Sequence, residues 1–476
     1  MVEGETFLTA TPRSTRTLVT ASPTCWARPR LAAGFTSTRV DVTESKGTCF
    51  IWFLRLTTVT EAGDANGVSP ARCPIRDEVK MVGALDGIRV LDLSTLVQGP
   101  QAAAMLHGLG ADVIKIELPE IGDMGRHVGI IPELGVSSFF AACNRGKRSV
   151  ALDLRTEGGR EAFIKLVETS DVVLSNFQPG TLEGWGLGYE DLAAVNPRIV
   201  WAAGSFLGPD GPDALREGAD IAGEAYGGVV AGIGNDGEPV TTVASLLADH
   251  CGSQNLQTGI LAALFAREKT GRGQRVDVSL LGGQIWMQAP EYTHYFLTGE
   301  LVGRSNGGHP LVHALYGVFP TSDGAIAMAG CPEHLWEGMC RAVDRLDWVD
   351  HPRFNTYFTT KEIAAEMRVE FLEIFLQRTT EEWVGRLEAE AQRFAPVRSH
   401  DEVAADPQSH ANGYIAEFEH PDWGLTNFVG SPIQMSDTPT RFGTDVPELG
   451  QDTEMTLVEA GFEWDELEGL RARGAW

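Results

Sequence analysis

From residue 81 onward, short apolar runs alternate with stretches of helical periodicity. Strand-like runs at 88–93, 113–116, 172–174, 199–203 and 276–280 are separated by helix-like stretches at 100–109, 157–168 and 245–269. Strands that alternate with helices build βαβ units, in which the strands are parallel and the helices cover the sheet. The sequence therefore predicts an α/β fold with a parallel sheet.

The pattern changes after about residue 286, where a Gly-, Pro- and His-rich stretch begins. Two runs, 316–320 and 325–329, flank the turn Thr-Ser-Asp-Gly at 321–324 and predict a β-hairpin. Helical patterns follow at 333–344, 361–376 and 380–390, and again at 452–473. We expect a second, smaller α+β domain in this part of the chain.

Residues 1–80 differ from the rest. They are rich in Ser, Thr, Arg and Pro, and hold ten basic and eight acidic side chains, so almost all of the acidity belongs to residues 81–476. Apart from the strand-like run 49–54 they show no pattern that would bury a core. We expect a dispensable leader, translated upstream of a natural start at Met81. A disordered extension and an Arg- and Ser-rich targeting peptide are the alternatives.

Composition excludes several functions. The formal charge of −27 argues against binding to nucleic acid, and no apolar run reaches the roughly 20 residues of a membrane-spanning helix. The seven cysteines form no C-x-x-C pair, so neither a disulfide framework nor a zinc site is expected. The H-E-x-x-H and Walker A motifs are missing from the sequence, and no G-x-S-x-G elbow between a strand and a helix marks a serine hydrolase. We therefore expect a metal-free, cytoplasmic protein without a membrane or nucleic-acid partner.

Asp249 is the first candidate for chemistry, because it lies near the start of the long predicted helix at 245–269. The positive end of a helix dipole favours an ionised carboxylate, which is the nucleophilic form. An acidic first-turn residue without chemistry is the alternative, and position alone leaves both open.

Several segments together resemble the class III CoA-transferase family, the CaiB/BaiF type, which contains formyl-CoA transferase, carnitine CoA-transferase and α-methylacyl-CoA racemase. The resemblance starts near residue 83 and excludes the leader. The segments occur in the family's order: Leu85–Leu93, Val97–Pro100, Leu109–Glu117, Gly122–Arg126, Asn144–Ser149, Asn176–Gly180, Lys269–Gln274 and Leu449–Thr453.

This resemblance implies a Rossmann-like large domain built from both chain ends, an inserted small domain and an interlocked homodimer. The expected division is a leader at 1–80, the large domain at 81–285, the linker and small domain at 286–405, and the return to the large domain at 406–476. It also implies an acyl-CoA:carboxylate CoA-transferase, with a CoA thioester and a carboxylic acid as substrates and no permanently bound cofactor. Asp249 would be the nucleophile, passing through an aspartyl anhydride and an aspartyl-CoA thioester.

Two other functions remain open. The racemases of the family pair the aspartate with a histidine, but the matching position here is Ala219. His250 follows Asp249 directly and would point about 100° away on a helix, so it is a poor replacement. A 2-methylacyl-CoA racemase is therefore the second candidate, and a non-catalytic CoA-binding protein is the third.

For CoA binding, the resemblance points to residues from four segments. Arg145, Lys147 and Arg148 offer further charge for the CoA phosphates, unless they form a solvated turn. Two arginines of formyl-CoA transferase are replaced by Leu118 and Gly184, and the segment 303–309 is either a counterpart of the family's glycine-rich loop or a linker. The CoA-binding residues expected from the resemblance are Val97, Gln98, Gly99, Leu152, Asp153, Arg155, Asn176, Phe177 and Arg216.

Overall fold

A computed structural model describes residues 83–354, 359–420 and 423–476. The predicted leader at 1–80 and its strand-like run 49–54 lie outside the described residues. The limits of the predicted domains remain predictions.

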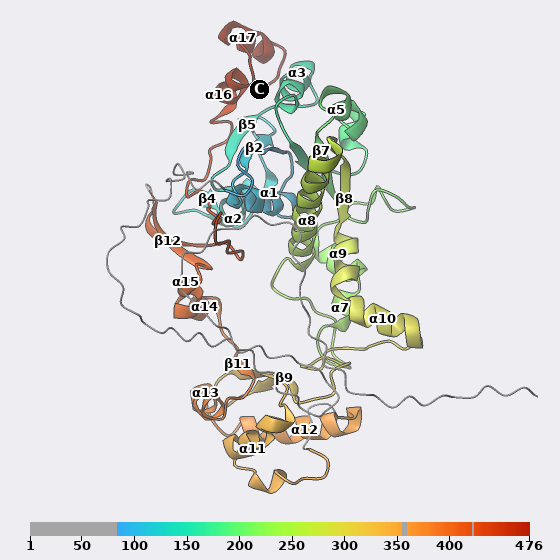
Figure 1. The fold of residues 1–476 in the computed structure, drawn as a ribbon, viewed down its shortest axis with the longest axis vertical. Coiled ribbons are helices and arrows are strands. Elements are labelled where there is room, and N and C mark those ends of the chain that lie inside the picture. Colours follow the sequence, from blue (N-terminus) through green and yellow to red (C-terminus); the bar gives the residue numbers. More distant parts are fainter. Residues whose placement is uncertain (1–82, 355–358, 421–422) are drawn as a thin grey trace, which may run out of the picture. The chain divides into compact units, whose positions relative to one another are not determined.

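A six-stranded sheet, with all neighbouring strands parallel, forms the centre of the fold (Figure 1). Its spatial order is β5-β2-β1-β6-β7-β8, so in chain order the strands lie third, second, first, fourth, fifth and sixth. The order reverses between β1 and β6, the arrangement of doubly wound dinucleotide-binding folds. The predicted α/β fold with a parallel sheet is confirmed. The strands are β1 (Arg89–Asp92), β2 (Asp112–Glu117), β5 (Arg148–Ala151), β6 (Val172–Ser175), β7 (Val200–Ser205) and β8 (Arg275–Ser279).

Side chains of successive strand residues point to opposite faces, and each face is covered by helices. In β1, Val90 faces the core under α1 (Gln98–Gly108) and α8 (Leu247–Thr270). Its neighbour Leu91 faces the core under α3 (Glu157–Val167) and α5 (Tyr189–Val195). The C-terminal helices α16 (Thr453–Glu459) and α17 (Trp464–Ala472) add to this second core, so residues from both ends of the described chain cover the same face.

Residues 315–396 contain a second core. The antiparallel strands β9 (Tyr316–Pro320), β10 (Ala325–Ala329) and β11 (Phe394–Pro396) carry Phe319, Ile326 and Met328, which are buried with aromatic side chains of the helices. The helices are α11 (Glu333–Ala342), η2 (Leu346–Trp348), α12 (Lys361–Phe375) and α13 (Thr380–Ala389). This core matches the strands and helices expected for the smaller α+β part.

The remaining elements are short or connect these two cores. They are η1 (Met124–His127), β3 (Ile130–Ile131), β4 (Val136–Ser137), α2 (Ser138–Asn144), α4 (Thr181–Gly184), α6 (Asp220–Tyr226), α7 (Val229–Gly232), α9 (Leu280–Met287), α10 (Ala289–Thr298), α14 (His400–Ala404), α15 (Pro407–Ala411), β12 (Ile415–His420) and β13 (Gly424–Val429). Among the described residues, no helix has both the length and the hydropathy needed to cross a bilayer.

Several elements were not predicted from the sequence, among them helices α2, α5 and α6, and the following three cases show why. Strand β5 follows basic residues and holds only four residues, so its pattern is weak. Helices α9 and α10 continue well past residue 286, where we expected a stretch without helices. The hairpin of β12 and β13 alternates exposed and half-buried side chains with few large apolar ones, which is why its strand signal is poor.

Candidate active site

Asp249 is the third residue of α8, and its side chain is partly buried. Burial raises the pKa of Asp249 to about 7, and the negative charge of Asp220 acts in the same direction. The sequence analysis expected the helix N-terminus to keep this carboxyl ionised. That expectation is wrong, since a carboxyl with this pKa is partly protonated at neutral pH.

The reason lies in the short helix α6, which packs against the start of α8. Oδ1 of Asp220 accepts the backbone N–H of Asp249 at 2.9 Å, and Oε1 of Glu224 accepts that of Leu247 at 3.3 Å. The amides that would stabilise a negative charge on Asp249 are therefore already bonded to two carboxyl groups of another helix.

Gln98 begins α1, and its side chain lies against Gly252, which follows Asp249 by three residues on α8. It fits between two glycines: a Cβ built on Gly204 would lie 2.3 Å from Oε1 of Gln98, and one built on Gly252 would lie 2.7 Å from its Nε2. Nε2 is buried and has no hydrogen-bond partner in the described part of the chain. An unpaired buried donor costs about 1–3 kcal/mol, so Gln98 holds a donor that a bound substrate can use.

A cavity of about 440 Å³ lies beyond the carboxyl ends of β1, β2, β5 and β6. In doubly wound sheets, ligands bind in the crevice at this edge, where the strand order reverses. Four of the residues expected to bind CoA line it, namely Leu152, Asp153, Arg155 and Phe177. Leu118, at a position where the resemblance led us to expect arginine, lines it as well.

Arg155 is the exposed cation of this cavity, with 60% of its side chain accessible. It holds the carboxylate of Asp153 with two hydrogen bonds, of 2.8 Å from Nε and 2.7 Å from Nη2. Phe177 meets Trp185 edge to face, with ring centroids 6.0 Å apart. The cavity thus presents an aromatic wall and, at its edge, the ion pair of Arg155 and Asp153.

The other expected CoA residues serve different purposes. Asn176 exchanges two hydrogen bonds of 2.8 Å with the backbone of Thr95, which fixes the loop after β1. Val97 is buried beside α1, and Gly99 is needed because a Cβ there would lie 2.2 Å from that of Ser94. Arg216 is exposed, with its guanidinium 5.5 Å from the ring centroid of Tyr226, and is not among the residues that line the 440 Å³ cavity.

The basic cluster at 145–148 does not face this cavity, and it is not a solvated turn either. Lys147 is buried and donates to Asp92 at 2.8 Å. Arg148 bonds Asp112 and Glu459 at 2.6 and 2.7 Å. The buried guanidinium of Arg145 lies over the rings of Phe428 and Phe442, at 4.7 and 5.0 Å from their centroids. The burial of Lys147 argues against its expected contact with CoA phosphates, whereas such contacts by Arg145, which lines two other cavities, and by Arg148 stay predictions.

Beneath the cavity lies a group of buried charges that the sequence analysis did not identify. Nζ of Lys115 lies 2.7 Å from Asp123 and 3.6 Å from Asp92. Burial alone would lower the pKa of Lys115, but Asp92 and Asp123 raise it above its usual value. Glu117 holds Arg126 at 2.8 Å. Charged residues inside the otherwise apolar run of β2 were the available signal, because an alternating Lys and Glu in a central strand must find partners.

A second cavity, of about 830 Å³, adjoins the start of α8 and is lined by Leu246 and His250. Nδ1 of His250 lies 2.7 Å from Oε1 of Gln101, and burial lowers the pKa of this histidine. At the position where racemases carry their second base, Ala219 is the residue before α6 and offers no titratable group. His250 is thus engaged with α1, and the predicted absence of a second base at position 219 stands.

The segment 303–309 is held by hydrogen bonds. Nη1 of Arg304 donates to the carbonyl oxygens of Asn235 and Glu238, both at 2.7 Å, and the amide of Ser305 donates to Gly232 at 2.8 Å. Nε2 of His309 lies 2.6 Å from Glu291. The segment is therefore anchored to the loop after α7 and to α10.

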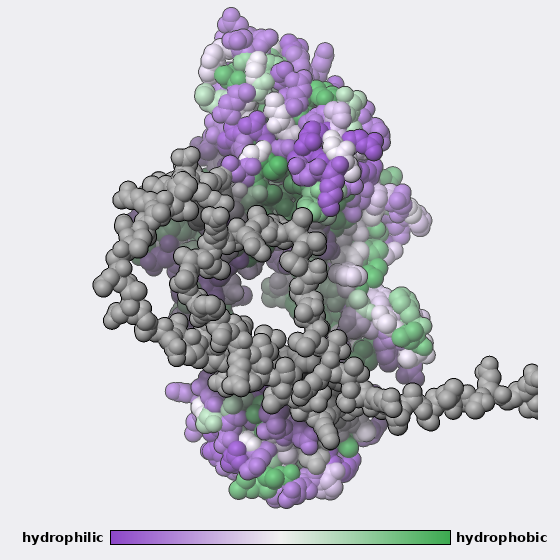
Figure 2. All heavy atoms as spheres, in the orientation of Figure 1, coloured by the Kyte–Doolittle hydropathy of each residue, from purple (hydrophilic) through white to green (hydrophobic). Residues whose placement is uncertain are grey.

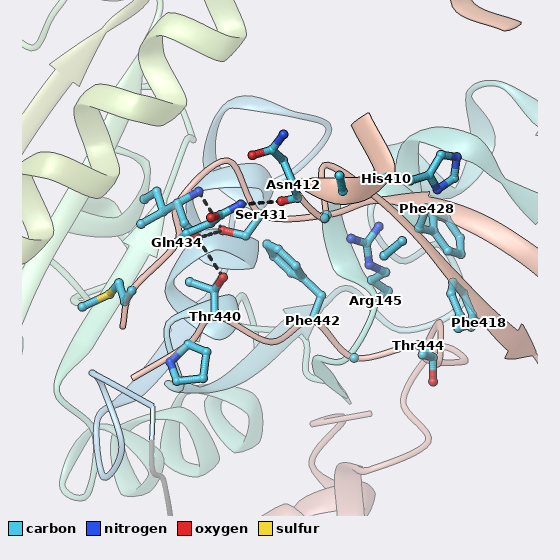
Figure 3. A pocket seen from close by; sticks show the side chains of 18 residues that line it. Arg145, His410, Asn412, Phe418, Phe428, Ser431, Gln434, Thr440, Phe442 and Thr444 are labelled. Atoms are coloured by element: carbon cyan, nitrogen blue, oxygen red, sulfur yellow. Dashed lines mark hydrogen bonds between the residues drawn. The ribbon is translucent and has the colours of Figure 1, made fainter. Parts of the chain in front are cut away.

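A third cavity, of about 580 Å³, lies between Arg145 and residues 410–444 of the C-terminal part of the chain (Figure 3). Its hydrogen bonds are internal to that chain, such as the 3.0 Å bond from Oγ1 of Thr440 to the carbonyl of Ile433. Of the residues expected to contact CoA, Arg145 is the one that lines it. Within the described ranges, no group of three or more His, Cys, Asp or Glu side chains is arranged to hold a metal ion.

Comparison with known proteins shows which family the chain resembles. A succinyl-CoA:mesaconate CoA-transferase of Haloarcula marismortui is 34% identical over 391 residues, covering 80% of this chain and 97% of the relative. A formyl-CoA:oxalate CoA-transferase of Escherichia coli O157:H7 is 31% identical over 420 residues, covering 82% and 99%.

Structural comparison agrees. The crystal structure of a CaiB/BaiF family protein from Brucella suis superposes with a TM-score of 0.70 at 29% identity, covering 80% of this chain and all of that one. The family profile described as CoA-transferase family III matches residues 85–453. The chain belongs to CoA-transferase family III and is a CoA-transferase by class.

Proposed function

We propose that the protein transfers CoA between two carboxylic acids with Asp249 as the nucleophile. The observation that carries this proposal is a partly buried carboxyl at the start of α8 together with the amide of Gln98, which lies against Gly252 of the next turn and whose Nε2 has no hydrogen-bond partner among the described residues. Its relatives are named for transfers between acids such as succinate and mesaconate or formate and oxalate.

The reaction needs neither water nor a net proton. The carboxylate of Asp249 attacks the thioester carbonyl, the C–S bond breaks, and CoA leaves as a thiolate from the mixed anhydride. The thiolate then attacks the Asp249 carbonyl and releases the donor acid, which leaves an aspartyl-CoA thioester. The acceptor carboxylate attacks this thioester and frees the thiolate again. Attack of the thiolate on the acceptor's acyl carbon yields the new acyl-CoA and restores Asp249.

Each attack places negative charge on a carbonyl oxygen, and Nε2 of Gln98 is the buried donor available to it. The nucleotide end of CoA would occupy the 440 Å³ cavity, with its base against Phe177 and a phosphate near Arg155. Leu118 and Gly184 cannot supply the charge of the two arginines they replace, so Arg155 carries the phosphate contact in this proposal.

We further propose a homodimer. Helix α10 has no buried residue, and large apolar side chains on it and beside it are exposed. Trp286 and Phe296 are each 74% accessible, Leu297 is 81% and Leu301 is 85%. Figure 2 shows hydrophobic residues gathered over this helix. A patch of this kind marks a protein interface, and a second copy of the chain is the partner that the family resemblance implies.

The proposal is tested by trapping the intermediate. Protein incubated with an acyl-CoA and then treated with hydroxylamine should carry a hydroxamate on Asp249, because hydroxylamine attacks an activated carboxyl group. Peptide mass spectrometry locates the adduct. The Asp249→Asn variant should give none, whereas Asp210→Asn, which removes an exposed carboxyl, should label like wild type. An adduct on another carboxyl would refute the role of Asp249.

A racemase is the second candidate, and it predicts a different result. Racemisation needs one group to remove the α-proton and another to return a proton on the opposite face. With Ala219 in place of the second base, we expect no exchange of the α-hydrogen of a bound 2-methylacyl-CoA in deuterium oxide, measured by NMR. Gain of exchange in Ala219→His would show that only the base was missing. Rapid exchange in the wild type would favour the racemase.

A further inference from the structure

The carboxyl groups of α6 act on the nucleophile through the backbone of α8. No side chain of α8's N-terminal flank caps this helix. Its first turn is bonded instead by Asp220 and Glu224, which are one turn apart on α6 and accept the amides of Asp249 and Leu247 at 2.9 and 3.3 Å. Oε2 of Glu224 also accepts the hydroxyl of Thr242, so this side chain is held from two directions.

We propose that Asp220 is a positioning residue for CoA transfer: its carboxylate fixes the first turn of α8 and places a negative charge beside the carboxyl of Asp249. The inference deepens the proposed function and rests on Asp249 being the nucleophile. Asp220 bonds the backbone of Asp249 and is not assigned any contact with substrate.

The effect follows from the charges around Asp249. Helix α8 packs against α1, α6, α9, β7 and β8. Neither α9 nor β7 carries a titratable side chain, and Arg275 of β8 is paired with Asp277 at 2.7 Å. After burial, Asp220 is the charge that raises the pKa of Asp249. The titratable groups on the elements around Asp249 are His107 on α1, Asp220, Glu224 and Tyr226 on α6, His250 and Cys251 near the start of α8, Arg267, Glu268 and Lys269 at its other end, and Arg275 and Asp277 on β8.

The pKa of Asp220 is also shifted by its surroundings. Burial raises the pKa of Asp220, the amide of Asp249 opposes this shift, and the charge of Glu224 adds to it. Nucleophiles and bases work best when their pKa lies near the working pH, and environments that push carboxyl pKa values apart assign their roles. Asp220 would thus make Asp249 a more basic, and hence more nucleophilic, carboxylate.

The test is a direct titration of Asp249 in the full chain labelled with ¹³C-aspartate, with its carboxyl signal assigned by its loss in Asp249→Asn. In wild type the signal should titrate with a pKa of about 7. In Asp220→Asn, which keeps an oxygen acceptor for the amide but removes the charge, the midpoint should fall by about one pH unit. Glu217→Gln removes an exposed charge from the same loop and should leave the midpoint unchanged.

In Asp220→Asn, the pH at which the transfer rate falls on the acid side should shift down together with the titration midpoint of Asp249, with little change in KM. In Asp220→Glu, both the pH profile and the midpoint should return to their wild-type values. Asp220→Ser removes the same charge and also keeps an oxygen that can accept the amide hydrogen bond. Either Asp220→Asn or Asp220→Ser is enough for the test if it folds. An unchanged midpoint in Asp220→Asn or Asp220→Ser would overturn the inference. So would loss of the fold in all three variants, since Asp220 would then be structural. The hydroxylamine experiment tests only whether Asp249 is the nucleophile. A failure of the inference about Asp220 can therefore be told apart from a failure of the proposed function.

Discussion

The Asp249→Asn variant is expected to lose CoA transfer to the limit of detection, a loss of about six powers of ten. The amide has nearly the shape of the carboxyl group but cannot form the anhydride, so no covalent intermediate arises. The fold should survive, because the carboxyl of Asp249 makes no hydrogen bond within the described residues. Transfer is measured by chromatographic separation of the two acyl-CoA species, and folding by the thermal unfolding midpoint.

The control for this variant is Asp210→Asn, which changes an exposed carboxyl of the loop after β7. It should transfer CoA at the wild-type rate. Affinity for free CoA should be the same in all three proteins, because the 440 Å³ cavity does not include Asp249. Turnover above about one thousandth of the wild-type rate in Asp249→Asn would sink the nucleophile assignment.

The Gln98→Leu variant is expected to lower kcat by about 10² to 10³, the usual cost of removing one donor from a developing oxyanion. Its stability should not fall. Nε2 of Gln98 is buried and has no partner in the part of the chain that the structure describes, so replacing the amide by an apolar side chain of similar size removes an unsatisfied group. A variant that loses activity while its unfolding midpoint stays equal or rises is the signature of a functional and not a structural side chain.

Gln254→Leu is the matched control, because Gln254 is an exposed amide on α8 that lines the second cavity and approaches neither glycine. Its kcat should match wild type in steady-state assays. If Gln98→Leu lowered the unfolding midpoint and left kcat unchanged, the amide would be a packing group of α1 and the donor role would be refuted.

The site was only partly accessible from the sequence. Asp249 and Gln98 were singled out through the resemblance, and Phe177 and Arg155, which it implies as CoA contacts, both line the 440 Å³ cavity. The pKa of Asp249 was misjudged, because the helix start was considered without the two carboxyl groups that α6 brings to it. Local sequence shows only one helix at a time, and this contact joins residues 29 positions apart.

The basic cluster at 145–148 is a second case in which the local sequence does not show the tertiary partners of a charged side chain. Charge density in a short segment suggested phosphate contacts. Burial of Lys147 against Asp92, and of Arg145 against two rings of the returning chain, assigns both to the interior. The partners lie 55 residues away in one case and in the C-terminal part of the chain in the other. No local pattern reveals such partners.

The amino-acid sequence alone is enough to predict the α/β class, the family, most of the longer helices and five of the six strands of the parallel sheet. These features depend on hydrophobic periodicity and on ordered motifs, which are properties of local segments. The pairing of side chains follows only from the packing of distant segments: α6 caps α8, Nε2 of Gln98 has no partner among the described residues, and Arg155 is the exposed cation of the 440 Å³ cavity. The physical reason is that burial and long-range partners set pKa values and hydrogen bonding, and both arise only when distant segments pack together.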